Sequence, residues 1–354
     1  MDKKHIVPSD ISILDAIERL NSLPGDRMTI ILVDESNRAV GTLTDGDIRR
    51  ALLRGVGLSD AASKAAFTDF RFLTQGEKDI SKLKELRSKG ITLIPVLDPD
   101  RRLVDILNLS ECTTRLPLRA VVMAGGKGER LRPATLNTPK PLLQIEGKAI
   151  IDYNIEALAA VGIEDITVTA RYLANQIKDH FAQPVAGVKV KVVEEDAPLG
   201  TIGSLALCDS TGAYDATLVM NSDLLTTISF EDMYLRHLDK DADVTIAVIP
   251  YQISVPYAIL TLDESNPDFV AGIEEKPAYS YYANAGIYIF SNRALDLLEK
   301  GHRTDATDLI QTALDNGLYV TYYPIQGTWI DVGSPVDFRQ AAELMRHHNS
   351  LEKR

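Results

Sequence analysis

A glycine-rich loop at residues 123–133 is the feature that most constrains how this chain can fold. It follows an apolar run, residues 118–123, which is typical of a buried strand that stops at a tight loop. Glycines let the backbone approach a ligand closely and leave N–H groups facing outward, which suits a phosphate. The glycines of the loop are Gly125, Gly126 and Gly128, and its basic residues are Lys127, Arg130 and Arg132. The loop therefore predicts a phosphate-containing ligand at the end of a strand.

Strands and helices alternate along the chain after this loop. The expected strands are residues 165–170, 188–193 and 216–220, and the expected helices are residues 149–161, 173–181 and 201–208. Such alternation predicts an α/β fold with a mostly parallel sheet and helices on both of its faces. Ligands of such sheets bind at the carboxyl ends of the strands. The glycine loop and Asp223, which follows the strand at 216–220, are therefore expected to meet.

The first third of the chain contains an internal repeat. Residues 33–44 (VDESNRAVGTLT) align without a gap with residues 97–108 (LDPDRRLVDILN), and each copy has the order helix, strand, turn, strand. This pattern resembles a tandem pair of CBS domains, called a Bateman module. The resemblance implies a regulatory CBS pair at residues 1–116 and a second domain at residues 117–354. Residues 112–117, which have no periodicity and contain a proline, are the expected linker.

The resemblance to CBS domains singles out Thr44 and Asp47 in the first copy. In CBS pairs, residues at these two positions commonly contact an adenine nucleotide, and a carboxylate can accept hydrogen bonds from ribose hydroxyls. The alternative is that Thr44 and Asp47 only cap the helix that starts nearby. The second copy has neither residue type at the equivalent places, so at most one standard nucleotide site is expected.

Composition excludes several classes of function. The chain has 354 residues, of which 45% are hydrophobic and 25% charged, as in an ordinary globular protein. Its net charge of −12 argues against nucleic acid and anionic membranes as partners. Two cysteines fit a reducing cytoplasm, and the N-terminal residues do not resemble a signal peptide. A cytoplasmic protein with no membrane partner is expected.

Two familiar phosphate-binding sites do not fit the glycine loop. A dinucleotide site needs an acidic residue at the end of the second strand, but that strand ends in Ala170-Arg171. A P-loop needs the pattern GxxxxGK followed by Ser or Thr, and the chain does not contain it.

Further motifs follow the loop in a fixed order and make it more specific. They are Pro139-Lys140-Pro141, Pro198-Leu199-Gly200-Thr201-Ile202-Gly203, Asn221-Ser222-Asp223, Glu274-Glu275-Lys276-Pro277, Asn284-Ala285-Gly286 and Trp329-Ile330-Asp331-Val332-Gly333. Together with the loop, they resemble the sugar-1-phosphate nucleotidyltransferases (NDP-sugar pyrophosphorylases) over about residues 118–340. This resemblance implies a Rossmann-like nucleotidyltransferase domain behind the CBS pair.

The resemblance also implies a role for each matching residue on the nucleotide side. Arg130 would hold the β- and γ-phosphates, and Lys140 would contact phosphates near the reacting centre. Asp223 and Asp331 would together hold Mg²⁺, a hard cation that prefers oxygen ligands. The implied nucleotide-binding residues are Ala124, Gly125, Gly126, Gly128, Glu129, Arg130, Lys140, Gly200, Thr201 and Asp223.

On the sugar side, the resemblance implies that Lys276 neutralises the sugar phosphate and acts with Arg130 and Lys140 in catalysis. Glu275, Asn284 and the backbone at Gly286 would bind sugar hydroxyls. The implied reaction is an in-line attack of the sugar phosphate on the α-phosphorus of a nucleoside triphosphate, with release of pyrophosphate. The nucleophile is already an anion, so positioning and charge neutralisation are expected to drive catalysis.

The form Leu199-Gly200-Thr201-Ile202-Gly203 is similar to that of family members that use GTP. With an N-terminal CBS pair, it resembles the enzymes that make GDP-glucosamine from glucosamine-1-phosphate for bacterial legionaminic acid. Three alternatives remain open: mannose-1-phosphate as acceptor, CTP or UTP as donor, and a non-catalytic protein that senses nucleotides. Ala258 stands where the family often has glycine beside the sugar. The resemblances also lead us to expect a homo-oligomer.

Overall fold

The computed structural model describes residues 3–23, 28–77, 79–91, 93–109, 113–208 and 214–352, with the side chains described as far as residue 346. The chain divides into two compact units, Met1–Arg115 and Leu116–Arg354. Of the expected linker at 112–117, Cys112 lies outside the described residues. Within the described ranges, no helix is both long and apolar enough to cross a membrane.

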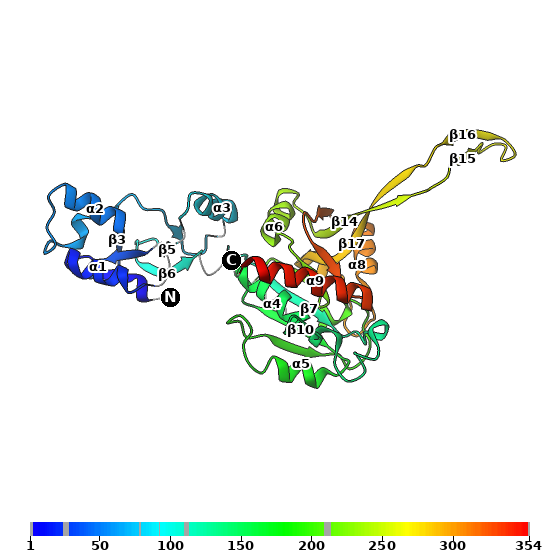
Figure 1. Cartoon of the computed structure of the whole chain (residues 1–354), viewed down its shortest axis with the longest axis horizontal. Coiled ribbons are helices and arrows are strands. Elements are labelled where there is room, and N and C mark those ends of the chain that lie inside the picture. Colours follow the sequence, from blue (N-terminus) through cyan, green and yellow to red (C-terminus); the bar gives the residue numbers. More distant parts are fainter. Residues whose placement is uncertain are drawn as a thin grey trace. The chain divides into compact units, whose positions relative to one another are not determined.

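The N-terminal unit contains two three-stranded sheets with the same strand order and pairing (Figure 1). The first is β1 (Ile6–Pro8), β2 (Thr29–Val33) and β3 (Ala39–Thr44), and the second is β4 (Leu73–Thr74), β5 (Leu93–Leu97) and β6 (Leu103–Asn108). In each sheet the first pair of strands is parallel and the second antiparallel. The structure thus contains the repeat that the sequence predicts.

In the described part of this unit, three α-helices accompany the sheets: α1 (Ile13–Asn21), α2 (Asp45–Leu53) and α3 (Ile80–Ser88). The predicted helical spacing is reflected in α1, whose buried residues are Ile13, Ala16 and Leu20. A separate apolar cluster joins the two copies, because it includes Ile31 of the first and Leu97 of the second. Short 3₁₀ helices lie at Lys3–His5 and Ala62–Lys64.

Thr44 and Asp47 form a capping box at the start of α2. Thr44 donates a hydrogen bond of 2.6 Å from its hydroxyl to the Asp47 carboxylate, and its backbone N–H donates another of 2.9 Å. Asp47 N–H donates in return to the Thr44 hydroxyl at 3.3 Å. The helix-capping role expected of this pair is therefore present, and nucleotide binding there stays a prediction.

The C-terminal unit is built on a seven-stranded sheet in the order β11-β10-β7-β12-β17-β14-β18. The strands are β7 (Arg119–Ala124), β10 (Ile166–Ala170), β11 (Lys191–Glu194), β12 (Ala216–Asn221), β14 (Val244–Ser254), β17 (Ala278–Ser291) and β18 (Val320–Pro324). Among the described strands of this sheet, only β17 runs antiparallel to its neighbours. The mostly parallel α/β sheet is confirmed.

The helices of this unit are α4 (Ile150–Ala160), α5 (Ala174–His180), α6 (Phe230–Asp239), α7 (Asn292–Leu295), α8 (Ala306–Asp315) and α9 (Pro335–Glu352). Shorter 3₁₀ helices are Glu129–Leu131, Lys140–Leu142 and Gly203–Leu207. Small two-stranded sheets pair β8 (Gln144–Ile145) with β9 (Lys148–Ala149), and β13 (Leu224–Thr226) with β19 (Trp329–Asp331).

Two predicted elements differ from the structure. The helix expected at residues 201–208 is only the 3₁₀ turn Gly203–Leu207, because the segment before it is held against the chain that leads into α8. The strand expected at 188–193 starts later, at Lys191, because Val185 and Val188 pair with each other around a tight turn.

A long hairpin projects from the sheet (Figure 1). Up to Val248, β14 also pairs with β18, and from Ile287 onward β17 also pairs with β12. Between these points β14 and β17 pair with each other alone, as far as Ser254 and Ala278, in the described structure. The hairpin ends in the antiparallel pair β15 (Ile259–Leu262) and β16 (Val270–Glu274). We call residues 249–283 the arm.

Candidate active site

The carboxyl ends of two neighbouring strands bring the glycine loop and Asp223 together. Asn221, the last residue of β12, is in register with Met123 of β7, and Ser222 N–H donates a hydrogen bond of 3.1 Å to the Met123 carbonyl. A cavity of about 560 Å³ opens at this edge of the sheet. Its lining includes all ten predicted nucleotide-binding residues, from Ala124 to Asp223. The predicted meeting of loop and carboxylate is confirmed.

Two glycines of the loop are required by their surroundings. A Cβ at Gly125 would lie 2.9 Å from Oε1 of Glu195, and one at Gly128 would lie 3.0 Å from the Cβ of Lys140. Gly128 also has φ = +60°, which side chains other than glycine rarely adopt. The loop therefore packs against the residues that line the rest of the cavity. Pro133 follows a 3₁₀ turn that ends at Leu131, and the proline disfavours helical geometry at Arg132 before it.

Lys140 lies between the two carboxylates that the sequence singles out. It is buried, its Nζ contacts Asp223 Oδ2, and it lies 3.6 Å from Asp331 Oδ1. Asp331 reaches this point because β19 pairs with β13, where Leu224 is in register with Asp331. Burial raises the pKa of the Asp331 carboxyl above its usual value, and the nearby Asp223 charge raises it further.

The two carboxylates fit a magnesium ion. Asp331 Oδ1 is buried and, among the described residues, has no hydrogen-bond partner beyond its 3.6 Å ion pair with Lys140, so it is an acceptor available to a cation. In the described part of the chain, no group of three or more His, Cys, Asp or Glu side chains is arranged to hold a metal. Mg²⁺ usually takes one or two protein carboxylates and completes its shell with phosphates and water. The predicted Mg²⁺ ligands are thus suitably placed, and the ion itself stays a prediction.

Arg130 lies beside the same carboxylates. Its guanidinium packs over Gly333, where a Cβ would come within 2.9 Å of an Arg130 terminal nitrogen. Its charge also acts on Asp331, because it lowers the pKa of that carboxyl against the effect of burial. Gly333 therefore makes room for Arg130 at the edge of the cavity.

The glycine motif at residues 198–203 is held by hydrogen bonds to the segment before α8. Thr201 N–H donates to Asp305 Oδ1 at 2.9 Å, and Ala306 N–H donates to the Thr201 hydroxyl at 2.8 Å. A Cβ at Gly200 would lie 2.5 Å from the Thr304 carbonyl oxygen. Arg303, which pairs with Asp305 at 3.0 Å, lines the cavity beside them. Sequence reasoning missed Arg303 and Asp305, which belong to no recognisable motif.

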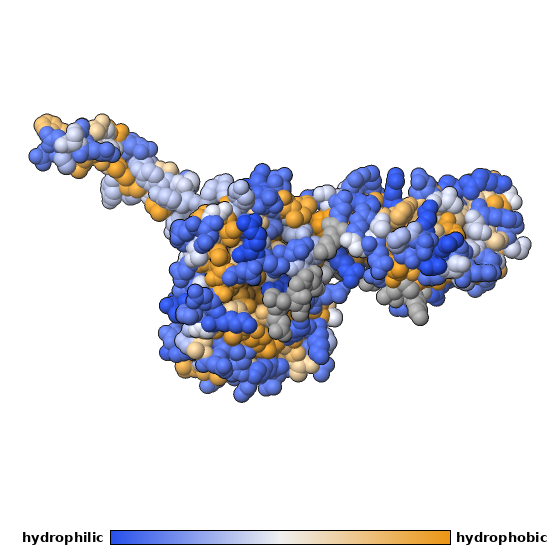
Figure 2. All heavy atoms as spheres, turned by 180° about the vertical axis from the view of Figure 1, so that it is seen from behind, coloured by the Kyte–Doolittle hydropathy of each residue, from blue (hydrophilic) through white to orange (hydrophobic). Residues whose placement is uncertain are grey.

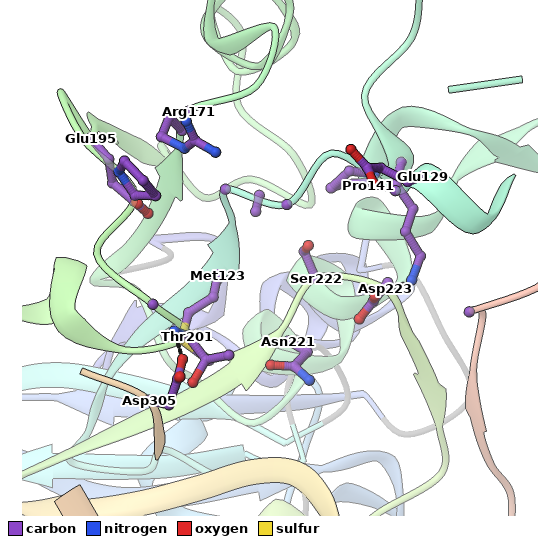
Figure 3. A pocket seen from close by; sticks show the side chains of 18 of the residues that line it. Met123, Glu129, Pro141, Arg171, Glu195, Thr201, Asn221, Ser222, Asp223 and Asp305 are labelled. Atoms are coloured by element: carbon purple, nitrogen blue, oxygen red, sulfur yellow. Dashed lines mark hydrogen bonds and ion pairs between the residues drawn. The ribbon is translucent and has the colours of Figure 1, made fainter. Parts of the chain in front are cut away.

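Sequence reasoning also missed Arg171 and Glu195 as cavity residues. Each follows directly or shortly after a strand of the parallel sheet, β10 and β11, so the rule that led to Asp223 could have found both. Glu195 is only 6% exposed. Figure 3 shows Arg171 and Glu195 on the opposite side of the cavity from Asp223.

The predicted sugar-side residues fall into two groups. Asn284 and Gly286 do not line the cavity but lie next to Asn221, which does. Gly286 N–H donates to Asn284 Oδ1 at 2.9 Å, and a Cβ at Gly286 would lie 2.4 Å from the side chain of Asn221. Glu275 and Lys276 lie on the arm, outside the cavity lining, with side chains 73% and 68% exposed. They are carried there because β14 and β17 continue to pair beyond the main sheet.

Comparison with known proteins settles the family. Residues 119–348 match the model of the nucleotidyl transferase family, and residues 1–54 match that of the CBS domain. The chain belongs to the nucleotidyl transferase family. Its Trp329 does not line the cavity but donates a hydrogen bond of 2.9 Å to the Ala285 carbonyl.

Relatives of this nucleotidyl transferase include two named as guanylyltransferases. The catalytic subunit beta of a mannose-1-phosphate guanylyltransferase from Dictyostelium discoideum is 31% identical over 243 residues, which is 67% of this chain and 66% of that protein. Mannose-1-phosphate guanylyltransferase 1 from Arabidopsis thaliana is 30% identical over 246 residues, with the same coverage. The match thus spans just under two thirds of these relatives.

Solved structures agree with the fold. HddC from Yersinia pseudotuberculosis superposes with a TM-score of 0.51 at 25% identity, covering 64% of this chain and 99% of that one. A protein from Bacillus anthracis assigned as a glucose-1-phosphate thymidylyltransferase gives a TM-score of 0.52 at 23% identity, covering 65% of this chain and 95% of that one. Both cover the share of the chain that the catalytic unit makes up.

Proposed function

We propose that this nucleotidyl transferase transfers a guanylyl group from GTP to a sugar-1-phosphate and releases pyrophosphate. The observation that carries the proposal is the cavity at the strand ends, where the glycine loop, Arg130 and Lys140 adjoin the Asp223–Asp331 pair. Backbone N–H groups and basic side chains on one side suit a triphosphate. Two carboxylates beside them suit the metal ion that such a reaction uses.

The chemistry follows from charge. An oxygen of the sugar phosphate attacks the α-phosphorus, a new P–O bond forms, and the bond to the β-phosphate oxygen breaks to release pyrophosphate. The attacking oxygen is already anionic, so no residue needs to remove a proton. Lys140 and Arg130 hold the two anions close and offset their repulsion. Mg²⁺ held by Asp223 and Asp331 would supply further positive charge at the phosphates.

Guanine is favoured by Glu195. Guanine presents two adjacent donors, its ring N1–H and its amino group, and a carboxylate can accept both. Adenine presents a ring acceptor at the same position, which a carboxylate would repel. Glu195 is buried on the side of the cavity away from Asp223, so the base and the reacting phosphates would occupy opposite ends. The guanylyltransferase names of the relatives support the same base.

Two sugars are candidates for the acceptor. Similarity to the relatives named above favours mannose-1-phosphate. The CBS domain at the N-terminus favours glucosamine-1-phosphate, because this combination resembles the enzymes that make GDP-glucosamine for legionaminic acid. The two sugars differ at C2, by an amine and by the configuration of that carbon, so one binding contact could separate them.

A matrix of substrates tests the proposal. Pyrophosphate release is measured with each of the four nucleoside triphosphates against mannose-1-phosphate, glucosamine-1-phosphate and glucose-1-phosphate, with and without Mg²⁺. We expect turnover with GTP and one of the first two sugars, and none without the metal. Turnover with CTP or UTP alone would overturn the base, and no turnover with any pair would overturn the reaction.

A further inference from the structure

The arm has one apolar face and one face that is polar beyond Tyr282, whose ring lies 5.0 Å from that of Tyr322 in β18. Residues directly opposite each other in an antiparallel pair share a face. Tyr251 faces Tyr281 and Ile253 faces Tyr279, whereas the residues between them, Gln252 and Ser280, face each other on the other side. Such alternation is typical of a sheet with one face buried. Yet these four apolar side chains are exposed in the single chain: Tyr251 57%, Tyr281 55%, Ile253 46% and Tyr279 37%.

The tip of the arm repeats the pattern. Leu260 is in register with Ile273, and Leu262 with Val270, and all four are more than half exposed. Among the described residues, the arm holds eleven of the twenty-five exposed large hydrophobic side chains, and Figure 2 shows apolar atoms along it. A two-stranded hairpin without a core is only marginally stable in water. An apolar surface of this kind indicates a partner.

Lys276 is presented by a structured turn on this arm. Its φ is +47°, although lysine rarely adopts this region and residues before proline favour extended geometry. Pro277, which follows it, is buried, and its carbonyl accepts a hydrogen bond of 3.0 Å from Val255 N–H. Such a conformation is strained and is found mainly where function requires it.

Binding two anionic substrates in the cavity requires another positively charged group. Of the four basic residues in its described lining, Lys140 is held by Asp223 and Asp331, Arg303 is paired with Asp305, and the other two are Arg130 and Arg171. A nucleoside triphosphate and a sugar phosphate both carry several negative charges, so a second anion needs more positive charge than Arg130 and Arg171 supply. Lys276 cannot supply it to its own cavity in this structure, because it precedes β17, and the extended strand from Ala278 to Asn284 alone spans about 20 Å.

We propose that the arm of one copy of this chain covers the cavity of a second copy and brings Lys276 to the sugar phosphate bound there. This inference rests on the proposed function. The exchange is reciprocal, so a two-fold dimer completes two sites with the same contacts. Two exposed apolar side chains are close in sequence to residues that line the cavity. Leu136, which is 51% exposed, lies between the loop and Lys140, and Val336, which is 62% exposed, lies three residues after Gly333. They offer the arm an apolar seat.

The charges favour a second copy over other occupants. The apolar face consists of uncharged side chains, so no like charges are brought together where this face packs against a second copy. The loop at the tip carries Asp263, Glu264 and Asp268, which would oppose docking to an anionic membrane or to nucleic acid. The straight ladder from Ile249–Ala283 to Ser254–Ala278 contains no register shift, so nothing within it serves as a hinge for folding back.

Mixed oligomers test the exchange directly. Lys276→Ala and Asp223→Asn copies are co-expressed with different affinity tags, and complexes that carry both tags are purified. Each variant alone is expected to lose at least about 100-fold in turnover. In a mixed dimer, the intact cavity of the Lys276→Ala copy receives the intact arm of its partner, so one of two sites works. We expect about half the wild-type turnover per dimer.

Two outcomes would overturn the inference. A doubly tagged complex with no more turnover than either variant alone would mean that each arm serves its own chain. Failure to recover any doubly tagged complex would mean that the copies do not assemble. If the wild-type protein turns over no substrate pair, the proposed function is wrong. The exchange of arms is then tested only by whether the chain forms a dimer through the arm.

Assembly is judged by two variants on opposite faces of the arm. Tyr281→Asp places a charge on the apolar face, and Ser280→Asp places the same charge on the polar face one residue away. Both side chains lie on the arm outside the core, so both variants should fold. In sedimentation velocity we expect a monomer for Tyr281→Asp and the wild-type dimer for Ser280→Asp. A dimer in both cases, or a monomeric wild type, would contradict the proposal.

Discussion

The carbonyl of Asp223 accepts a hydrogen bond of 3.0 Å from the N–H of Val332, which fixes the end of one strand to a segment far along the chain. Asp331 precedes Val332, so the two carboxylates of the pair are placed by backbone contacts rather than by flexible side chains. Their shared contact with Lys140 shows that they converge on one point.

Asp331→Asn should lower turnover by about 100-fold or more, because the amide is a weaker ligand for Mg²⁺ than the carboxylate. The measurement is kcat as a function of Mg²⁺ concentration, and the apparent metal requirement should rise as well. Glu343→Gln, on the exposed surface of α9, removes the same charge away from the cavity and serves as a control. Equal activity of the two variants would remove Asp331 from the metal site.

Glu195→Gln should reduce the preference for GTP over the other nucleotides by about 10- to 100-fold, since an amide cannot accept both guanine donors. The measurement is kcat/KM for each of the four nucleoside triphosphates. Glu194→Gln is the matched control, because Glu194 pairs with Lys178 at the surface and does not line the cavity. If Glu195→Gln leaves the preference for GTP unchanged, residues other than Glu195 recognise the base.

Gly128→Ala should lower the free energy of unfolding of the catalytic unit by about 1–2 kcal/mol, the cost of a side chain in the left-handed region. The new Cβ would also press on Lys140 and Thr135, each 3.0 Å away. Gly126→Ala is the matched control, with nothing within 4 Å of the added atom. Urea unfolding followed by fluorescence of Trp329, the single tryptophan, reports this unit alone. Equal midpoints for the two variants would contradict the expectation.

His237 should make the catalytic unit less stable in acid. Burial lowers its pKa to about 4, and its Nδ1 lies 2.8 Å from the Thr245 hydroxyl. In the unfolded chain the histidine has a pKa of about 6.5, so below this pH the unfolded chain binds a proton that the folded chain does not bind. The free energy of unfolding therefore falls as the pH drops from about 6.5 to about 4. The loss attributable to this group is about 3 kcal/mol. Urea unfolding at a series of pH values measures it.

His237→Gln provides the comparison for that pH series. Carboxyl groups also titrate in this range, so the quantity of interest is the difference between the two pH profiles. The glutamine variant should lack the component that begins near pH 6.5. Parallel profiles for the two proteins would show that His237 does not contribute.

The sequence predicts the sheet and most of the cavity because the signals are local. An apolar run that stops at glycines or at Asp223 identifies both the strand and its functional end. The short strands and capping residues of the N-terminal repeat, such as Ser12 at α1, are recognisable for the same reason. The ten predicted nucleotide-binding residues consequently line one cavity.

Features that depend on distant contacts are harder to predict. Residues 201–208 have the composition of a helix, but Asp305 holds Thr201 and only a 3₁₀ turn forms. Arg303 reaches the cavity through the same contact and has no motif of its own. The position of Lys276 depends on how far β14 and β17 remain paired, which alternation in the sequence alone does not fix.

The β13–β19 pair also has a consequence for the order of events during translation. Every other charged group at the phosphate end of the cavity, including Arg130, Lys140 and Asp223, is synthesised long before Asp331. Proteins emerge from the ribosome N-terminus first, at about 5–20 residues per second. A nascent chain could therefore form the glycine loop and its strand before it has the second carboxylate. Its catalytic competence would arrive only once Asp331 has been synthesised.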